Sequence, residues 1–136
     1  MPLVIDTSVT MAWCFEDEAD EATDRVLDRL TEDHAVVPAL WQLEVANVLL
    51  VAERRKRITE AQATRFLDLL GGLPIRIDHF SGDATAVLAT GRRHGLSAYD
   101  AAYLILAERL AVPLATLDDR LRTACSNAGV PLAIPR

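Results

Sequence analysis

The sequence has few cysteines, no long apolar run and no glycine-rich phosphate loop. Only Cys14 and Cys125 occur in 136 residues, and their contexts fit neither a disulfide framework nor a zinc site. No basic-then-apolar leader is present, and no apolar run approaches the ~18 residues of a membrane span. The doublet Gly71-Gly72 lacks the pattern of a phosphate-binding loop. We therefore expect a reduced, cytoplasmic protein without a membrane segment.

Histidine and lysine are also scarce. The three histidines, His34, His79 and His94, share no metal-ligand spacing, and none lies in a nucleophile motif. We expect them on the surface or in loops. These absences argue against metal ligation by nitrogen or sulfur and against catalysis by a histidine-activated nucleophile.

The net charge is −6, but the negative charge is concentrated in one segment. Residues 16–33 hold nine of the twenty Asp and Glu residues and only two of the fourteen Lys and Arg residues. The rest of the chain is close to neutral. The acidity therefore belongs to one helix face, and the overall charge remains compatible with a nucleic-acid partner.

Short buried strands alternate with helices along the chain. The apolar run Leu3–Ile5 predicts a central strand of a parallel sheet that helices cover on both faces. Further strands are predicted at 35–37, 75–77, 113–117 and, at an edge, 130–134. Helices are predicted at 9–15, 17–31, 40–57, 59–71, 82–94, 97–107 and 119–128. We expect one three-layer α/β domain over residues 1–136, with a mostly parallel sheet of about five strands.

Four acidic residues lie in apolar surroundings near strand ends or helix starts. Asp6 and Asp118 each follow a buried strand, so they should project from the same edge of a parallel sheet. Glu44 interrupts an apolar helix face, and Asp100 lies in the first turn of the most apolar helix. We expect the four carboxylates to share one pocket.

Several close carboxylates favour a bound cation. Asp100 or Asp118 alone has a structural explanation, because each could simply stabilise a helix N-terminus. Together, however, close like charges cannot all stay ionised without a compensating charge. Oxygen ligands without His or Cys favour Mg²⁺ or Mn²⁺ over zinc, as one or two ions.

Two further groups of side chains are candidates for contacts with partners. The basic run that ends the helix carrying Glu44 fits either a solvated helix end or a phosphate contact; it consists of Arg54, Arg55, Lys56 and Arg57. Large aromatic residues lie close in sequence to Asp6 or Glu44, either as core residues or as apolar anchors beside the pocket; they are Trp13, Phe15 and Trp41.

The ordered set of motifs resembles the PIN domain and, more narrowly, the VapC-type toxins of bacterial toxin–antitoxin pairs. The resemblance covers essentially the whole chain. The motifs that carry it are Asp6-Thr7-Ser8, Glu44 with Asn47, the segment 99–104, and Ala115-Thr116-Leu117-Asp118 with Leu121. The resemblance implies a metal-dependent endoribonuclease whose catalytic acids are Asp6, Glu44, Asp100 and Asp118. Asp6, Asp100 and Asp118 would bind the metal, and Ser8, Asn47 and Thr116 match supporting polar positions.

The resemblance also implies partners. An RNA substrate, a cognate VapB-like antitoxin and a homodimer or higher toxin–antitoxin assembly are expected. An amphipathic antitoxin segment would use the aromatic anchors, and one of its arginines would reach the carboxylates in place of metal.

Two other classes of protein gather acids around Mg²⁺. A receiver-like signalling module normally needs a lysine at the end of its last strand, whereas the only lysine here is Lys56. A phosphatase with an aspartyl nucleophile usually needs a second acid two residues after the first, where this chain has Ser8. Assays with labelled RNA and with acetyl phosphate separate these alternatives.

Overall fold

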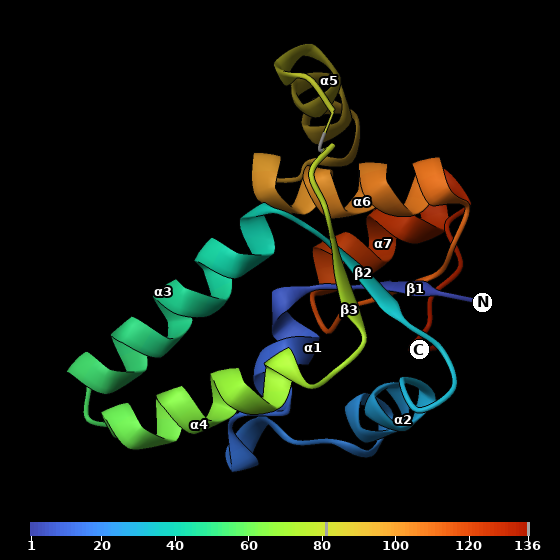
Figure 1. The fold of residues 1–136 in the computed structure, drawn as a ribbon. Coiled ribbons are helices and arrows are strands. Elements are labelled where there is room, and N and C mark those ends of the chain that lie inside the picture. The colour runs from blue at the N-terminus through green and yellow to red at the C-terminus, as the bar shows by residue number, and fades with distance from the viewer. Residues whose placement is uncertain (81, 136) are drawn as a thin grey trace.

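The computed structural model describes residues 1–80 and 82–135 and shows a sheet between two layers of helices (Figure 1). The elements are β1 (Leu3–Ile5), α1 (Thr7–Ala12), the 3-10 turn η1 (Glu16–Glu18), α2 (Glu21–Arg29), β2 (Ala35–Pro38), α3 (Leu40–Arg54), α4 (Glu60–Gly71), β3 (Ile75–Asp78), α5 (Ala84–His94), α6 (Ala98–Leu110), β4 (Leu114–Ala115) and α7 (Asp119–Ala128). The strands pair in parallel in the order β3-β2-β1-β4.

The strand order explains the two helical layers. The chain moves outward from β1 through β2 to β3, and then returns across the sheet to β4 on the other side of β1. Because such crossovers are right-handed, the reversal of direction moves the later helices to the opposite face. Figure 1 shows α6 and α7 on one side of the sheet and α1, α2 and α4 on the other. The predicted three-layer α/β fold is confirmed.

Strand β1 lies at the centre of the core, as its apolar sequence predicts. Leu3, Val4 and Ile5 are fully buried, and they pair with β2 on one side and β4 on the other. Tyr103 and Leu104 of α6 are also buried, with at most 1% of their surface exposed. The carboxyl end of β1 therefore reaches the sheet edge with almost no freedom to move.

The sheet has four strands in the described residues rather than the expected five. The predicted strand at 130–134 is reduced to a single bridge between Leu114 and Leu132. Leu114 N donates to Pro131 O and Ala133 N donates to Leu114 O, both at 3.0 Å. Pro131 and Pro135 have no N–H to donate, so the ladder cannot extend in either direction.

The predicted acidic helix at 17–31 is divided into η1 and α2. Asp20 lies at the break, where its carboxylate accepts hydrogen bonds from Ala22 N and Thr23 N and begins α2. This capping favours a new helix start over a continuous helix.

In the described part of the chain, no helix is both long and apolar enough to cross a membrane.

Candidate functional site

A small pocket of about 140 Å³ opens at the carboxyl edge of the sheet. All four acids predicted from the sequence line it, and so do three hydroxyl side chains; the lining residues are Asp6, Thr7, Ser8, Glu44, Asp100, Tyr103 and Asp118. The acids come from the end of β1, from α3, from the first turn of α6 and from the start of α7. Residues more than 100 positions apart in sequence therefore meet in one pocket.

Asp6 is the most buried of the four acids, with 5% of its surface exposed. Its Oδ1 accepts hydrogen bonds from Ser8 Oγ at 2.6 Å and from Val9 N at 3.1 Å, and its Oδ2 accepts one from Thr116 Oγ1 at 2.5 Å. Burial raises the pKa of Asp6 to about 6, although these hydrogen bonds act in the opposite direction, and the charge of Asp100 raises it further. The ionised carboxylate is therefore fixed in orientation but energetically costly.

Two hydroxyl groups join the ends of β1 and β4. Ser8 Oγ accepts a hydrogen bond from Leu117 N at 3.0 Å while it donates to Asp6. Thr116 Oγ1 accepts one from Asp118 N at 3.0 Å while it also donates to Asp6. The structure thus places Ser8 and Thr116 directly on the Asp6 carboxylate, as a supporting role requires.

Asp118 and Asp100 lie at the starts of two helices that border the pocket. Asp118 is the N-cap of α7, where its Oδ1 accepts a hydrogen bond from Leu121 N at 2.9 Å. Asp100 is half-buried in the first turn of α6, which Ser97 caps. Burial raises the pKa of Asp100, and the charges of Asp118 and Glu44 raise it further. Asp100 and Asp118 therefore both lie at helix N-termini and line the acidic pocket.

Glu44 is held by two hydroxyl groups that the sequence analysis did not identify. Its Oε1 accepts hydrogen bonds from Tyr103 Oη at 2.6 Å and from Thr7 Oγ1 at 3.0 Å. Burial raises the pKa of Tyr103 far above its usual range, and the hydrogen bond to Glu44 raises it further, so the phenol remains a proton donor. One signal was available, because Tyr103 lies three residues after Asp100 and therefore shares its helix face.

The pocket has the donor set of a site for a hard divalent cation. Among the described residues, no three Asp, Glu, His or Cys side chains lie close enough together to hold a metal ion as they stand. The pocket nevertheless concentrates carboxylate oxygens, and their mutual repulsion contributes to the raised pKa values of Asp6 and Asp100. A bound Mg²⁺ or Mn²⁺ would offset this repulsion and prefers oxygen ligands. The residues present therefore fit the cation that the sequence predicts.

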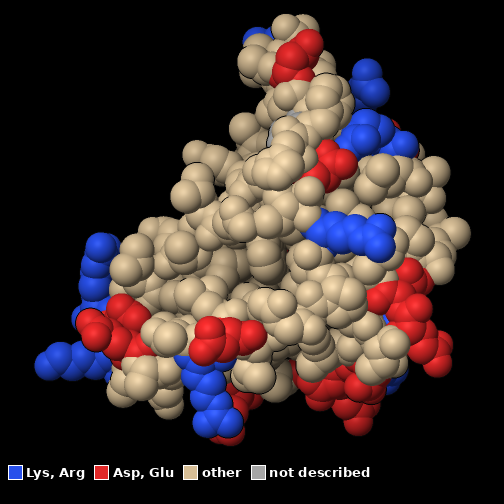
Figure 2. Space-filling model, in the orientation of Figure 1, with Lys and Arg blue, Asp and Glu red and all other residues tan. Residues whose placement is uncertain are grey.

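Asn47 and the basic run lie outside this pocket. Asn47 is exposed on α3 and is not one of the lining residues. The basic run begins ten residues after Glu44, about 15 Å farther along the helix axis. Figure 2 shows basic and acidic side chains side by side at the corner where α3 ends in Figure 1.

Arg57 has a structural role that the sequence analysis did not foresee. Its guanidinium lies 2.7 Å from Asp17 Oδ1 and 2.9 Å from Glu18 Oε2. It also lies 3.8 Å from the centre of the Phe15 ring. Arg57 thus neutralises part of the acidic segment. Contact with RNA stays a prediction for all four residues of the basic run, Arg54, Arg55, Lys56 and Arg57, whose side chains are exposed.

The expected aromatic anchors are mostly core residues. Phe15 is buried beneath Arg57, and half-buried Trp13 donates its indole N–H to Thr23 O at 2.9 Å. Trp41 is 7% exposed, and its indole N–H donates to Thr10 Oγ1 at 3.0 Å. The structure therefore favours the core alternative for all three, although one face of Trp41 borders a second cavity.

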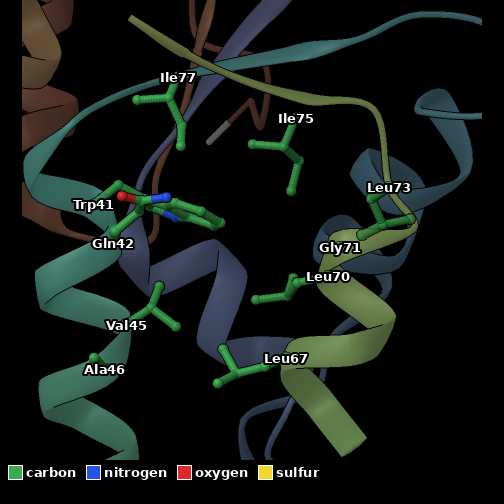
Figure 3. A pocket seen from close by; sticks show the side chains of 10 residues that line it. All are labelled: Trp41, Gln42, Val45, Ala46, Leu67, Leu70, Gly71, Leu73, Ile75 and Ile77. Atoms are coloured by element: carbon green, nitrogen blue, oxygen red, sulfur yellow. The ribbon is translucent and has the colours of Figure 1, made fainter. Parts of the chain in front are cut away.

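The second cavity, of about 380 Å³, is apolar and lies between α3, α4 and β3 (Figure 3). Its lining residues are Trp41, Gln42, Val45, Ala46, Leu67, Leu70, Gly71, Leu73, Ile75 and Ile77. Leu67 is 48% exposed at its wall. The cavity shares no lining residue with the acidic pocket and offers no carboxylate for chemistry.

Comparisons with known proteins match the whole fold. A family model described as PIN domain matches residues 3–126. Ribonuclease VapC3 of Pyrobaculum aerophilum is 32% identical over 123 residues, which cover 89% of this chain and 92% of the relative. The crystal structure of PAE2754 from Pyrobaculum aerophilum gives a TM-score of 0.71 at 22% identity, with 91% of this chain and 84% of that one covered. VapBC2 from Rickettsia felis, bound to a DNA fragment from their promoter, gives a TM-score of 0.66 at 14% identity, with 97% of both chains covered. The chain therefore belongs to the PIN domain family and, within it, to the VapC-type proteins.

Proposed function

We propose that this protein is a Mg²⁺- or Mn²⁺-dependent endoribonuclease that cleaves RNA phosphodiester bonds. The observation that carries the proposal is the meeting of Asp6, Glu44, Asp100 and Asp118 in one pocket at the sheet edge. The relative named Ribonuclease VapC3, which matches nearly the full length of the chain, supports the reaction class. Several carboxylates with hydroxyl support, and no histidine or cysteine among the lining residues, are typical of a metal-assisted hydrolase.

Asp6, Asp100 and Asp118 would hold the cation, and Glu44 would complete its surroundings directly or through water. A divalent cation bound there supplies a more acidic water and neutralises charge that develops on the phosphate. The protein's own contribution is orientation, since Ser8, Thr116 and Val9 N already fix both oxygens of Asp6. A site arranged before substrate binds avoids the cost of arranging it during the reaction.

RNA cleavage is expected to depend on the divalent cation. Purified protein should cleave single-stranded RNA with Mg²⁺ or Mn²⁺, lose this activity in excess EDTA and recover it when the cation is restored. Gel analysis of end-labelled RNA measures the effect. Equal cleavage in EDTA would contradict the metal-nuclease proposal.

An acetyl phosphate assay tests the two alternative classes. A receiver-like module would become phosphorylated, and a phosphatase would release phosphate. The single lysine lies at Lys56 beyond the end of α3, whereas a receiver needs its lysine at the carboxyl end of the last strand. This position favours the nuclease over the receiver.

We further propose that the protein is the toxin of a toxin–antitoxin pair. An unrestrained ribonuclease would damage its host, and VapBC2 from Rickettsia felis shares the fold. The amphipathic segment of a VapB-like antitoxin needs an apolar surface near the pocket, and the cavity beside Trp41 is the candidate. A homodimer stays a prediction from the resemblance.

A small protein encoded beside this one is expected to copurify with it and to inhibit RNA cleavage. Trp41→Ala would weaken the complex, but Trp41 is also a buried core residue, so Leu67→Lys is the sharper variant. Leu67→Lys should weaken the complex while cleavage and melting temperature stay unchanged. Leu69→Lys is the matched control, because Leu69 is exposed on the same helix but does not line the cavity. If no neighbouring gene product binds, the toxin proposal fails while the nuclease proposal stands.

A further inference from the structure

We propose that Thr7 and Tyr103 are positioning residues that hold the Glu44 carboxylate in the acidic pocket. The expected effect on kcat rests on the proposed nuclease function, whereas the expected position of the Glu44 carboxylate does not. Neither residue touches Asp6, Asp100 or Asp118 through a hydrogen bond in the structure, and both touch Glu44. Their effect on the reaction would therefore pass through Glu44.

Glu44 differs from Asp6 and Asp118 in how the backbone supports its carboxylate. The carboxylates of Asp6 and Asp118 each accept a hydrogen bond from a helix N-terminal N–H. Asp100 has a short side chain in a helix first turn. Glu44 has a longer side chain in the second turn of α3, and the hydrogen bonds found for its carboxylate come from the side chains of Thr7 and Tyr103. Without other partners it would occupy several rotamers, because glutamate has high side-chain freedom.

Two hydroxyls from different elements supply the missing support. Tyr103 Oη lies 2.6 Å and Thr7 Oγ1 lies 3.0 Å from Glu44 Oε1, and the two hydroxyl oxygens lie 3.0 Å from each other. Both contacts are made to Oε1, so Oε2 is left to face a ligand in the pocket. Because the two carboxylate oxygens are rigidly connected, holding Oε1 also fixes the direction in which Oε2 points.

The same two hydroxyls link Glu44 to the other acids. Thr7 directly follows Asp6 at the start of α1, and Tyr103 lies one turn after Asp100 on α6. Tyr103 is 1% exposed, so its ring is fixed by core packing. The triad of Thr7, Glu44 and Tyr103 therefore fixes α3 against α1 and α6 at the pocket, and it sets where Glu44 lies relative to Asp6 and Asp100.

Tyr103→Phe is the central test, because it removes the hydroxyl and keeps the buried ring. We expect kcat for cleavage of a short RNA to fall about 10- to 100-fold, the range typical of groups that orient a site's ligands. KM for RNA should change less than about twofold, since the lost contact does not bind substrate. Tyr99→Phe is the matched control on the same helix, because Tyr99 is 63% exposed, and it should retain wild-type kinetics.

Thr7 provides a second, independent pair of variants. Thr7→Val removes the hydroxyl at nearly constant volume and should lower kcat, whereas Thr7→Ser keeps the hydroxyl and should retain most of the activity. Wild-type kcat in both Tyr103→Phe and Thr7→Val would overturn the proposal. An equal loss in Thr7→Ser and Thr7→Val would overturn it for Thr7, because the hydroxyl would then not be the important group.

Crystal structures of wild type and Tyr103→Phe test the geometry without reference to activity. The Glu44 carboxylate is expected to turn or become disordered in the variant while the backbones of α3 and α6 stay in place. An unmoved carboxylate would overturn the positioning role even if kcat falls. If wild type cleaves no RNA, the proposed function fails, and this structural comparison still decides whether Thr7 and Tyr103 position Glu44.

Discussion

Asp6→Asn is expected to reduce RNA cleavage by about 10²- to 10³-fold, the loss seen when one preorganised electrostatic group is removed from an active site. The substitution keeps the size of the side chain and removes the charge that would face the cation. The fold should survive, because asparagine is also a good N-cap and its carbonyl can accept the hydrogen bonds from Ser8 and Val9. Initial cleavage rates with saturating Mg²⁺ measure the effect.

Asp20→Asn is the matched control for this experiment. Asp20 also caps a helix through backbone N–H groups, those of Ala22 and Thr23, but it is exposed and lies outside the acidic pocket. It should cleave RNA at the wild-type rate. Cleavage by Asp6→Asn at the same rate as Asp20→Asn would show that the Asp6 charge is not needed, and the metal-nuclease proposal would fail.

Without a divalent cation, the protein should become more stable relative to Asp6→Asn as the pH falls from 7 to 5. Burial raises the pKa of Asp6 from 3.8 in the unfolded chain to about 6 in the folded protein. At pH 7 the carboxylate is ionised in both states, and the folded state carries the cost of the buried charge, about 3 kcal/mol. Below pH 6 the folded state binds a proton that the unfolded state does not, so stability increases until both are protonated below about pH 4.

Urea unfolding in EDTA at pH 7 and pH 5 measures this effect. Asp6→Asn should exceed wild type in unfolding free energy at pH 7, and the difference should shrink by about 1 kcal/mol at pH 5, where the folded carboxyl is mostly protonated. The comparison between the two proteins cancels the titration of acids that do not interact with Asp6, whereas Asp100, whose charge raises the pKa of Asp6, contributes to the difference. A difference that stays constant or grows as the pH falls would mean that Asp6 does not bear a buried, costly charge.

The sequence was sufficient to predict which acids meet at the sheet edge. Asp6 and Asp118 follow strands that turn out to be neighbours, and neighbouring parallel strands place their carboxyl ends together. The apolar settings of Glu44 and Asp100 indicated that both face inward. These inferences depend on burial and on the order of strands, which local sequence patterns encode well.

The partners of Glu44 could not be predicted in the same way. Thr7 and Tyr103 lie 37 and 59 positions from it in sequence. Their meeting depends on the angle at which α3 passes α1 and α6, and side-chain ridges across the whole interface determine that angle. A local motif carries no information about it.

Trp41 and Arg57 show a related limit. A tryptophan near a site fits both a core residue and a surface anchor, because its ring is apolar and its N–H needs a partner. The partner here is Thr10, 31 positions away. Arg57 likewise belongs to a basic run whose simplest explanation is exposure, and its acidic partners are 39 and 40 positions away. Polar pairing between distant segments decides both cases.

The hydrogen bonds between the ends of β1 and β4 determine when the acidic pocket can form during translation. Asp6 is translated more than 100 residues before Thr116 and Asp118, which complete its surroundings. A nascent chain therefore cannot assemble the acidic pocket until β4 and the start of α7 have left the ribosome. Chains that terminate before β4 would carry Asp6, Glu44 and Asp100 but lack the Thr116 and Asp118 contacts. If the proposed function holds, such fragments are expected to be inactive, so that RNA cleavage appears only after synthesis has passed Asp118.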